Sequence, residues 1–170
     1  MKRSAGVLMP ISSLPSKYGI GTLGKGARDF IDFLEKSGQT YWQVLPIGPT
    51  GYGDSPYQSF SSNAGNPYFI DLDDLCDEGY LEKEEYVNEN YGTDVNCVDY
   101  AQIYNTRFTV LRKAVERLSA VQTEDYLSFL RDNAYWLNDY ALFMAEKDDH
   151  KGQAYTTWEE DIRKHDTKTL

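Results

Sequence analysis

The sequence predicts an α/β protein whose first part begins a parallel sheet and whose second part is helical. Three observations support this prediction. Residues 1–67 contain all six prolines and ten of the thirteen glycines, so turns interrupt this region often. Residues 68–170 contain no proline and carry 23 acidic against eleven basic residues, which is typical of solvated helices. Within the first part, two apolar runs flank a segment of helical periodicity, the order that builds a parallel strand–helix–strand unit.

The strand–helix–strand unit lies near the start of the chain. The apolar run Gly6–Ile11 is bounded by turn formers and predicts a buried strand. A helix is expected from Gly26, because apolar residues then recur at helical spacing as far as Leu34. Gly38 follows at the place where a left-handed C-cap glycine belongs. A second buried strand is predicted over Trp42–Ile47.

The rest of the chain is predicted to be helical after a short strand or strand-like exit over Tyr68–Leu72. A short acidic helix with a surface loop is expected within Asp77–Asn90, and a longer helix over Asp99–Leu118. One apolar face of that longer helix is expected to consist of Tyr104, Phe108, Leu111, Val115 and Leu118.

Two capping signals mark the helices near the end of the chain. Thr123 can cap a helix that continues to about Asp148, and acidic residues follow it near the positive end of the helix. Thr157 with Glu160 matches the capping-box pattern and predicts the start of a last short helix.

Composition argues against several classes of protein. The 17 Lys and Arg against 27 Asp and Glu give a net charge of −10, whereas nucleic-acid binding needs a basic face. His150 and His165 lie in acidic surroundings and are expected to be solvated, and with Cys76 and Cys97 they form no recognisable zinc pattern. No stretch approaches the ~20 apolar residues of a membrane-spanning helix. We therefore expect a cytoplasmic protein with reduced thiols, no bound metal and no membrane partner.

The segment Gly19–Gly24 matches the dinucleotide fingerprint G-x-G-x-x-G, but its context differs from that of a nucleotide site. The fingerprint normally begins at the end of a strand, whereas Pro15 and six other residues separate it here from Ile11. Residues 39–53 contain no acidic residue to bind a ribose. The sequence thus favours a flexible loop and helix entry, and no cofactor is expected. A nucleotide-dependent enzyme remains an alternative that measurable NAD or ATP binding would support.

Residues 48–67 form a long segment without periodicity, and such loops are uncommon in compact domains unless they are functional. Proline and glycine alternate there with Tyr52, Asp54, Ser55 and Tyr57. A tyrosine offers a flat apolar face to a sugar ring and a hydroxyl to its polar rim. The alternative is a packed loop whose tyrosines fill gaps. A lone carboxylate is weak evidence for catalysis, so Asp54 is expected to bond nearby backbone amides and shape the turn.

Two segments, Ser12–Gly21 and Tyr41–Phe60, carry a resemblance to a known family, the second of them long, irregular and highly specific. They resemble the N-terminal part of the 4-alpha-glucanotransferases, the amylomaltase or disproportionating-enzyme family. The match continues through Ala64–Pro67 to Ile70–Leu72. Beyond residue 75 the resemblance is looser and rests on Val98–Tyr100, Trp136–Leu142 and Trp158.

The resemblance implies a (β/α)8 TIM barrel, of which residues 1–75 form the first β/α elements and residues 76–170 an acidic helical insertion subdomain. A barrel needs about 250 residues, so the remainder is expected C-terminal to Leu170. The implied activity is a retaining, cofactor-free transfer of α-1,4-glucan segments between maltodextrins, with glucans and glucose as partners. The family's catalytic acids have no matching position in residues 1–170, so no residue is assigned a catalytic role and the chain alone is expected to be inactive. A non-catalytic glucan-binding module is the alternative.

The resemblance also implies roles for individual residues. Tyr57 is expected to contact sugar near the cleavage point, and Ser55 is expected to bind the substrate as a hydrogen-bonding neighbour along the glucan. Tyr52 and Tyr104 are expected to form an aromatic platform for a more distant glucan stretch, although the apolar periodicity alone favours core packing for Tyr104. Loop shaping is assigned to Asp54, Gly53 and Pro56.

Overall fold

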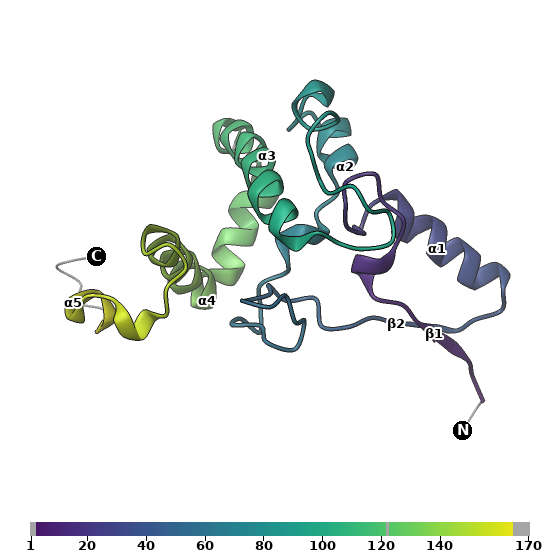
Figure 1. Ribbon diagram of the computed structural model, residues 1–170, viewed down its shortest axis with the longest axis horizontal. Coiled ribbons are helices and arrows are strands. Elements are labelled where there is room, and N and C mark those ends of the chain that lie inside the picture. The colour runs from purple at the N-terminus through teal and green to yellow at the C-terminus, as the bar shows by residue number, and fades with distance from the viewer. Residues whose placement is uncertain (1–2, 122, 165–170) are drawn as a thin grey trace. The chain divides into compact units, whose positions relative to one another are not determined.

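The computed structural model describes residues 3–121 and 123–164, and its contacts divide the chain into two compact units (Figure 1). The first unit is Met1–Val121 and the second is Gln122–Leu170. His165 lies outside the described residues. The predicted division after residue 75 refers to a whole barrel and stays a prediction, since here the helix that follows it packs with the earlier residues.

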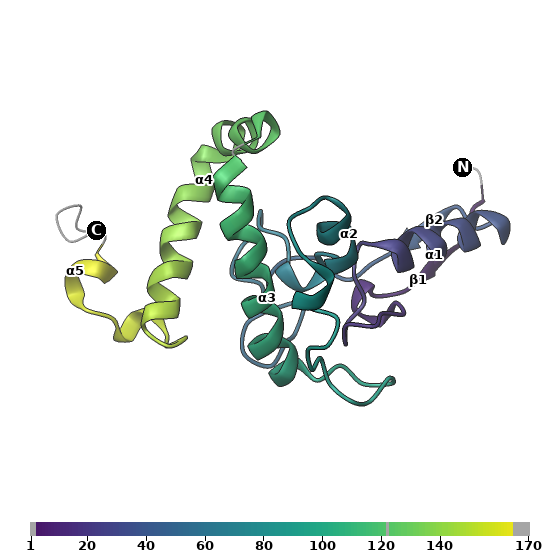
Figure 2. The ribbon, with the colours of Figure 1, turned by 90° about the horizontal axis from the view of Figure 1, so that it is seen from above.

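The predicted order of strand, helix and strand is confirmed, but the second strand covers Tyr41–Gln43 instead of Trp42–Ile47. Neither strand is buried as predicted, because the described sheet has only these two strands and the side chains on one of its faces lack a covering layer. Strands β1 (Gly6–Leu8) and β2 (Tyr41–Gln43) pair in parallel, with Val7 opposite Trp42. Helix α1 (Lys25–Lys36) runs alongside the strand pair (Figure 2). The first strand is shorter than expected because Pro10 leads directly into a 3-10 turn over residues 11–13.

Helix α1 ends in the glycine cap that the sequence predicts. Gly38 has a φ of 69°, a left-handed conformation that costs glycine little. Its amide donates a hydrogen bond to the Glu35 carbonyl (2.9 Å), and the Gln39 amide donates to the Leu34 carbonyl (2.9 Å). These bonds satisfy carbonyls of the last turn that have no partner within the helix.

The core of the first unit is formed mainly by helix α3 (Tyr100–Val121) and the segments packed against it. The predicted helix is confirmed, but its predicted buried face is wrong in part. Tyr104 and Val115 are exposed, because the buried face is rotated toward Ile103 and Arg107. The buried cluster comprises Tyr18, Ile20, Tyr68, Leu72, Leu81, Tyr86, Tyr91, Ile103, Val110, Leu111 and Ala114.

No strand forms over Tyr68–Leu72. Ile70 and Asp71 are extended, as in the strand-like exit that the sequence also allowed, and side-chain caps start helical turns on either side of them. The Asn66 carbonyl oxygen accepts a hydrogen bond from the Tyr68 amide (2.9 Å), which starts a 3-10 turn over Pro67–Phe69. The Asp71 carboxylate then caps helix α2 (Leu72–Asp77) by accepting from two amides of its first turn. Asn and Asp are favoured at such positions because they satisfy amides that lack helical partners.

The acidic helix predicted within Asp77–Asn90 is also wrong. Helix α2 ends where this segment begins, and Gly79 then adopts a φ of 82° that redirects the chain. A 3-10 turn over Lys83–Glu85 follows, closed by reciprocal capping between Glu82 and Glu85. Local capping therefore replaces helical propagation in a stretch whose composition favours helix.

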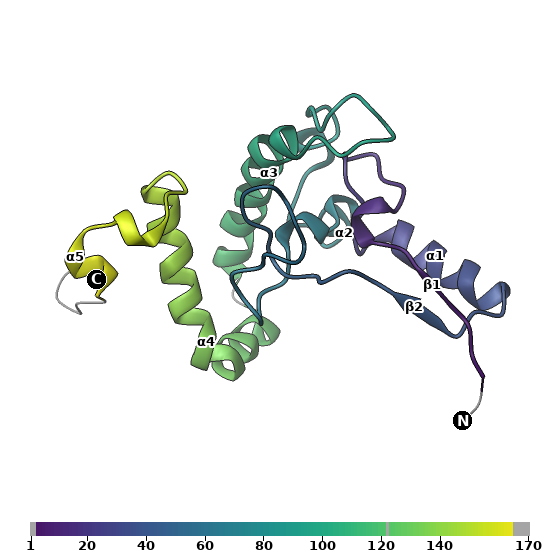
Figure 3. The same cartoon turned by 60° about the horizontal axis from the view of Figure 1, so that its bottom comes forward.

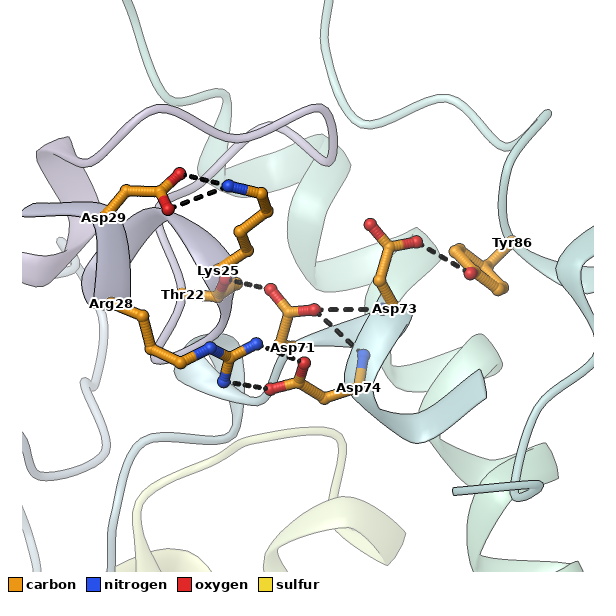
Figure 4. A network of polar contacts seen from close by, with 8 residues as sticks. All are labelled: Thr22, Lys25, Arg28, Asp29, Asp71, Asp73, Asp74 and Tyr86. Carbon is orange, nitrogen blue, oxygen red and sulfur yellow. Dashed lines mark hydrogen bonds and ion pairs between the residues drawn. The ribbon is translucent and has the colours of Figure 1, made fainter. Parts of the chain in front are cut away.

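Carboxylates at the start of α2 tie this helix to α1 (Figure 4). Arg28 of α1 donates two hydrogen bonds to the Asp74 carboxylate, at 2.7 and 2.9 Å. The Thr22 hydroxyl donates to Asp71. The Arg28–Asp74 pair is exposed and lowers the pKa of Asp74 by hydrogen bonding, so it orients the two helices more than it stabilises them.

Asp73 binds two buried phenols. The hydroxyls of Tyr18 and Tyr86 donate to the same oxygen of Asp73, at 2.6 and 2.8 Å. Burial, followed by the hydrogen bond to Asp73, raises the pKa of both tyrosines well above the usual value. The contact joins the loop before α1 to the segment after α2.

The second unit consists mainly of helix α4 (Glu124–Asp149) and the short helix α5 (Glu160–Arg163). The predicted cap of α4 is confirmed, since the Thr123 hydroxyl accepts a hydrogen bond from the Tyr126 amide (3.2 Å). The predicted capping box at Thr157 is wrong. That hydroxyl donates to the Ala154 carbonyl (2.7 Å) within a 3-10 turn and does not cap α5.

His150 is packed and not solvated as predicted. Its ring stacks on Trp158 with a centroid separation of 5.0 Å. Its Nδ1 lies 2.8 Å from the Glu146 carbonyl and its Nε2 lies 2.7 Å from the Glu159 carboxylate. The end of α4 is thereby joined to the segment that leads into α5.

Cys76 and Cys97 are both free. Within residues 3–121 and 123–164, no helix combines the length and the apolar character needed to cross a membrane.

Candidate functional site

The segment 48–67, which we call the tyrosine loop, follows strand β2 and returns beside helix α3 (Figure 3). Its two ends are held together, because the Asn66 amide donates a hydrogen bond to the Ile47 carbonyl (2.8 Å). Gly48 permits a close approach of the returning chain, since a side chain there would meet Ser59. A loop closed at its base in this way can present side chains in fixed positions.

The tyrosines of this loop project into solvent. Tyr52 is fully exposed and Tyr57 is 72% exposed. The alternative in which these rings fill gaps in a packed loop is therefore wrong. Ser55 is half-buried, and its hydroxyl accepts a hydrogen bond from the Tyr57 amide (3.4 Å). The loop thus presents two free aromatic faces on either side of a turn.

Asp54 occupies the turn between these tyrosines and points inward. Its φ of 53° lies in the left-handed region, which Asp tolerates better than most residues. Its amide donates to the Gly51 carbonyl (3.1 Å), while its carboxylate is hydrogen-bonded to Thr50 and not to the backbone amides that the sequence suggested. Burial raises the pKa of the Asp54 carboxyl, and the hydrogen bond with Thr50 opposes this effect.

A cavity of about 200 Å³ lies beneath the loop, between it and the start of α3. Asp54 is the one carboxylate among the described residues that line it. Retaining glycoside chemistry requires two carboxylates at a defined separation, so this cavity cannot perform it alone. The cavity is lined by Pro10, Ile11, Ser12, Ile20, Leu45, Pro46, Thr50, Asp54, Pro56, Asn66, Phe69 and Tyr100.

The first turns of α3 complete the site. Tyr104 is 56% exposed and meets Phe108 edge to face, with a centroid separation of 5.5 Å, so core packing does not explain it. Burial, followed by the charges of the nearby Asp54 and Tyr104, raises the pKa of Tyr68 to about 12. Burial and the Asp54 charge also raise the pKa of Tyr100. The tip of the tyrosine loop and the start of α3 therefore share one electrostatic environment.

The glycines of Gly19–Gly24 serve close packing of the chain. A side chain at Gly21 would meet the Ile11 carbonyl, and one at Gly24 would meet the Asp71 carboxylate. Gly24 caps α1, so a negative carboxylate already lies at the helix terminus where a pyrophosphate would bind. The structure leaves no space for a nucleotide at this motif. Nor does the described part of the chain contain a group of three or more His, Cys, Asp or Glu placed to hold a metal ion.

Sequence reasoning missed the residues that support the tyrosine loop. Thr50 holds the Asp54 carboxylate, Asn66 closes the base of the loop, and Tyr100 lines the cavity. Asn directly before Pro67 is a recognisable turn signal that would have indicated one of them. The contact between Thr50 and Asp54 is local but has no recognised sequence signal, and the place of Tyr100 depends on packing between segments far apart in the sequence.

The fold is similar to part of a solved amylomaltase. The amylomaltase from Streptococcus agalactiae, solved in complex with acarbose, superposes with a TM-score of 0.86 at 44% sequence identity. The superposition covers 94% of this chain and 32% of that chain. The strand–helix–strand unit and the helices described above thus correspond to a segment of a larger α/β enzyme.

The chain belongs to the 4-alpha-glucanotransferase family, whose family model matches residues 9–170. The 4-alpha-glucanotransferase of Clostridium butyricum is 50% identical over 155 residues, covering 91% of this chain and 32% of that protein. The enzyme of Streptococcus pneumoniae serotype 4 is 51% identical over 158 residues, covering 92% of this chain and 31% of that protein. The chain therefore spans about a third of the length of the curated relatives it matches.

Proposed function

We propose that this chain supplies glucan contacts to a 4-alpha-glucanotransferase, which transfers α-1,4-glucan segments between maltodextrins. The observation that carries the proposal is the tyrosine loop of a family member, closed at its base and projecting Tyr52 and Tyr57 into solvent. Aromatic rings that lie close together on an exposed surface often mark a site for a ligand or a partner. A ring that offers both an apolar face and a hydroxyl suits a glucose unit.

The roles of the individual residues follow from their positions. Tyr57 contacts the sugar near the cleavage point, and Ser55 holds the backbone beside it. Tyr52 and Tyr104 form a platform for a more distant part of the glucan. Asp54 anchors the turn between the loop tyrosines and stays out of the chemistry, because it has no second carboxylate in its cavity among the described lining residues.

The chemical step belongs to the remainder of the enzyme. We propose that residues 1–75 form the first β/α elements of a (β/α)8 barrel, that residues 76–170 form a helical insertion, and that the catalytic carboxylates follow Leu170 in the complete protein. One carboxylate would form the glycosyl-enzyme intermediate, and the other would act as acid and then base while an acceptor sugar hydroxyl takes the glycosyl group. Two free thiols agree with a cytoplasmic location.

A chimera tests this proposal. Residues 1–170 are grafted in place of the matching third of the Streptococcus agalactiae amylomaltase, and glucose release from maltotriose is measured for the chimera and for the isolated chain. We expect an active chimera and an inactive isolated chain. Glucose release by the isolated chain would overturn the proposal. An inactive chimera, together with maltodextrin binding by the isolated chain, would instead support a non-catalytic glucan-binding module.

A substitution in the chimera tests the role of Tyr57. Replacing Tyr57→Ala removes one ring contact and one hydroxyl, so kcat/KM for maltotriose should fall about tenfold or more. Tyr135→Ala is the matched control, because Tyr135 is a similarly exposed tyrosine on α4 of the second unit. Equal activity of the two variants would contradict the assignment of Tyr57.

A further inference from the structure

Arg107 is the most deeply buried charged residue that the described part of the chain contains. Its side chain lies within α3 and is 0% exposed. Its Nη2 donates a hydrogen bond to the Ile70 carbonyl. Its Nε and Nη1 have no acceptor among the described residues. Burial lowers the pKa of the guanidinium to about 10, so Arg107 is still a cation at neutral pH.

Stability alone does not explain this arginine. A buried charge is costly unless it is paired and its donors are satisfied. An apolar side chain of similar length would fill the same place without the cost of a buried charge, at the loss of the donor to the Ile70 carbonyl. We therefore look for the role of Arg107 in the segment that its hydrogen bond to Ile70 holds in place.

Ile70 lies at the point where the tyrosine loop returns to the core. The loop closes at Asn66, a 3-10 turn follows, and Ile70 comes next before the cap of α2. Within that turn, the centroid of the Tyr68 ring lies 6.2 Å from that of Tyr100 and 5.7 Å from that of Phe108, both on α3. The base of the loop is thus packed on α3 by Tyr68 and bonded to α3 by Arg107.

Tyr104 projects from the same part of α3. It lies three residues before Arg107 and four residues after Tyr100, between the contacts that hold the base of the loop. Any shift of the loop along α3 would therefore change the separation between Tyr104 and the loop tyrosines. A hydrogen bond to a backbone carbonyl opposes such a shift, whereas apolar packing alone permits it more easily.

We propose that Arg107 is a positioning residue that holds the tyrosine loop in register with Tyr104, so that a long glucan can contact both elements at once. This inference rests on the proposed function. It concerns the chain-length preference of glucan binding: a glucan that spans both elements gains affinity from the alignment, and a short one that meets a single element does not.

The test compares the chimera described above with its Arg107→Met and Arg107→Lys variants. Calorimetric affinities for maltoheptaose and maltotriose are measured together with the thermal unfolding midpoint. In Arg107→Met, affinity for maltoheptaose should fall roughly threefold to tenfold, the loss of about one aromatic contact, while affinity for maltotriose changes little. The unfolding midpoint should change little, because relief of the buried charge offsets the loss of the donor to the Ile70 carbonyl. Arg107→Lys keeps a donor for the Ile70 carbonyl and should restore part of the preference for maltoheptaose.

Arg117→Met is the matched control. Arg117 also lies on α3 and donates to a backbone carbonyl, that of Tyr80 at 3.2 Å, and it pairs with Glu85 at 2.8 Å. Its loss should leave the ratio of the two affinities unchanged. If Arg107→Met keeps the wild-type ratio, or weakens both glucans equally, the inference is overturned.

Hydrogen exchange separates failure of this inference from failure of the proposed function. If the unsubstituted chimera binds neither glucan, the proposed function fails, and the positioning role is still measurable in the backbone. Arg107→Met should speed amide exchange in residues 48–70, whereas Arg117→Met should not. Unchanged exchange in that segment would overturn the positioning role independently of any glucan.

Discussion

At the scale of single residues, Gly21 shows how the absence of a side chain shapes the first unit. Its amide donates a hydrogen bond to the Ser12 carbonyl (3.1 Å), so two parts of the loop before α1 touch backbone to backbone. A Cβ at this position would meet the Ile11 carbonyl and would lie 2.9 Å from the Leu14 Cβ. Both neighbours are themselves buried and cannot move aside easily.

We therefore expect Gly21→Ala to lower the free energy of unfolding by roughly 1–3 kcal/mol, the usual cost of overpacking. Urea denaturation measures this change. Gly65→Ala is the control, because no atom lies within 4 Å of a Cβ at Gly65 and that residue has no positive φ. Equal stability of the two variants would show that the loop around Gly21 can relax.

At the scale of elements, local sequence signals predicted most of the helices. Gly38 and Thr123 mark helix ends through hydrogen bonds within a few residues, so their effect is visible in a short window. The segment Tyr68–Leu72 has the composition of a strand, but Asn66 and Asp71 cap amides there and start helical turns. Composition alone does not show which of two local hydrogen-bonding patterns prevails.

The sequence also indicated part of the candidate site. The tyrosine loop and its residues Tyr52 and Tyr57 are recognisable from the sequence because the segment is irregular and specific. For Tyr104 the two predictions differed: the resemblance implied an aromatic platform, whereas helical periodicity placed the residue on the buried face, and its side chain is exposed. The hydrogen bond of Arg107 could not be predicted from the sequence either, because its partner Ile70 lies 37 residues away in another segment.

His150 connects the end of helix α4 to the segment before α5. Both of its ring nitrogens face acceptor oxygens, of Glu146 and Glu159, and only the imidazolium carries a proton on each nitrogen. The hydrogen bond to Glu159, followed by that to Glu146, raises the pKa of His150 above 6.5, and the charge of Asp149 acts in the same direction. The link is therefore strongest when the ring is charged.

We expect the stability of the second unit to fall as pH rises. Because the folded state holds the proton more tightly than the unfolded state, the contribution of His150 is complete below pH 6.5 and is lost as pH rises through the raised pKa. NMR titration of the ring should give a pKa above 6.5, and Glu159→Gln should bring it down. A wild-type value at or below 6.5 would contradict the ion pair.

At the scale of the whole molecule, the sheet of the described residues has two strands and therefore two open edges. Large apolar side chains on and near it are exposed, among them Leu8, Tyr41 and Ile47. A two-stranded parallel pair is too small to be stable by itself, and open edges can pair with other chains.

We expect the isolated chain to self-associate through this sheet, which size-exclusion chromatography with light scattering would detect. Tyr41→Lys places a charge on the exposed strand and should reduce association. Val95→Lys is the control, because Val95 is 97% exposed in a loop outside the sheet. A chain that remains monomeric at high concentration would favour the independent glucan-binding module over a part of a barrel.

The two phenols that share Asp73 give the first unit an internal optical signal. A phenolate absorbs at longer ultraviolet wavelengths than a phenol, and neither Tyr18 nor Tyr86 can ionise in mild alkali while its hydrogen bond to Asp73 holds. When the unit opens above about pH 10, both protons leave together, and their release itself favours the open state. Loss of this core should thus add a cooperative step in absorbance to the signal of the other twelve of the fourteen tyrosines, without any attached dye.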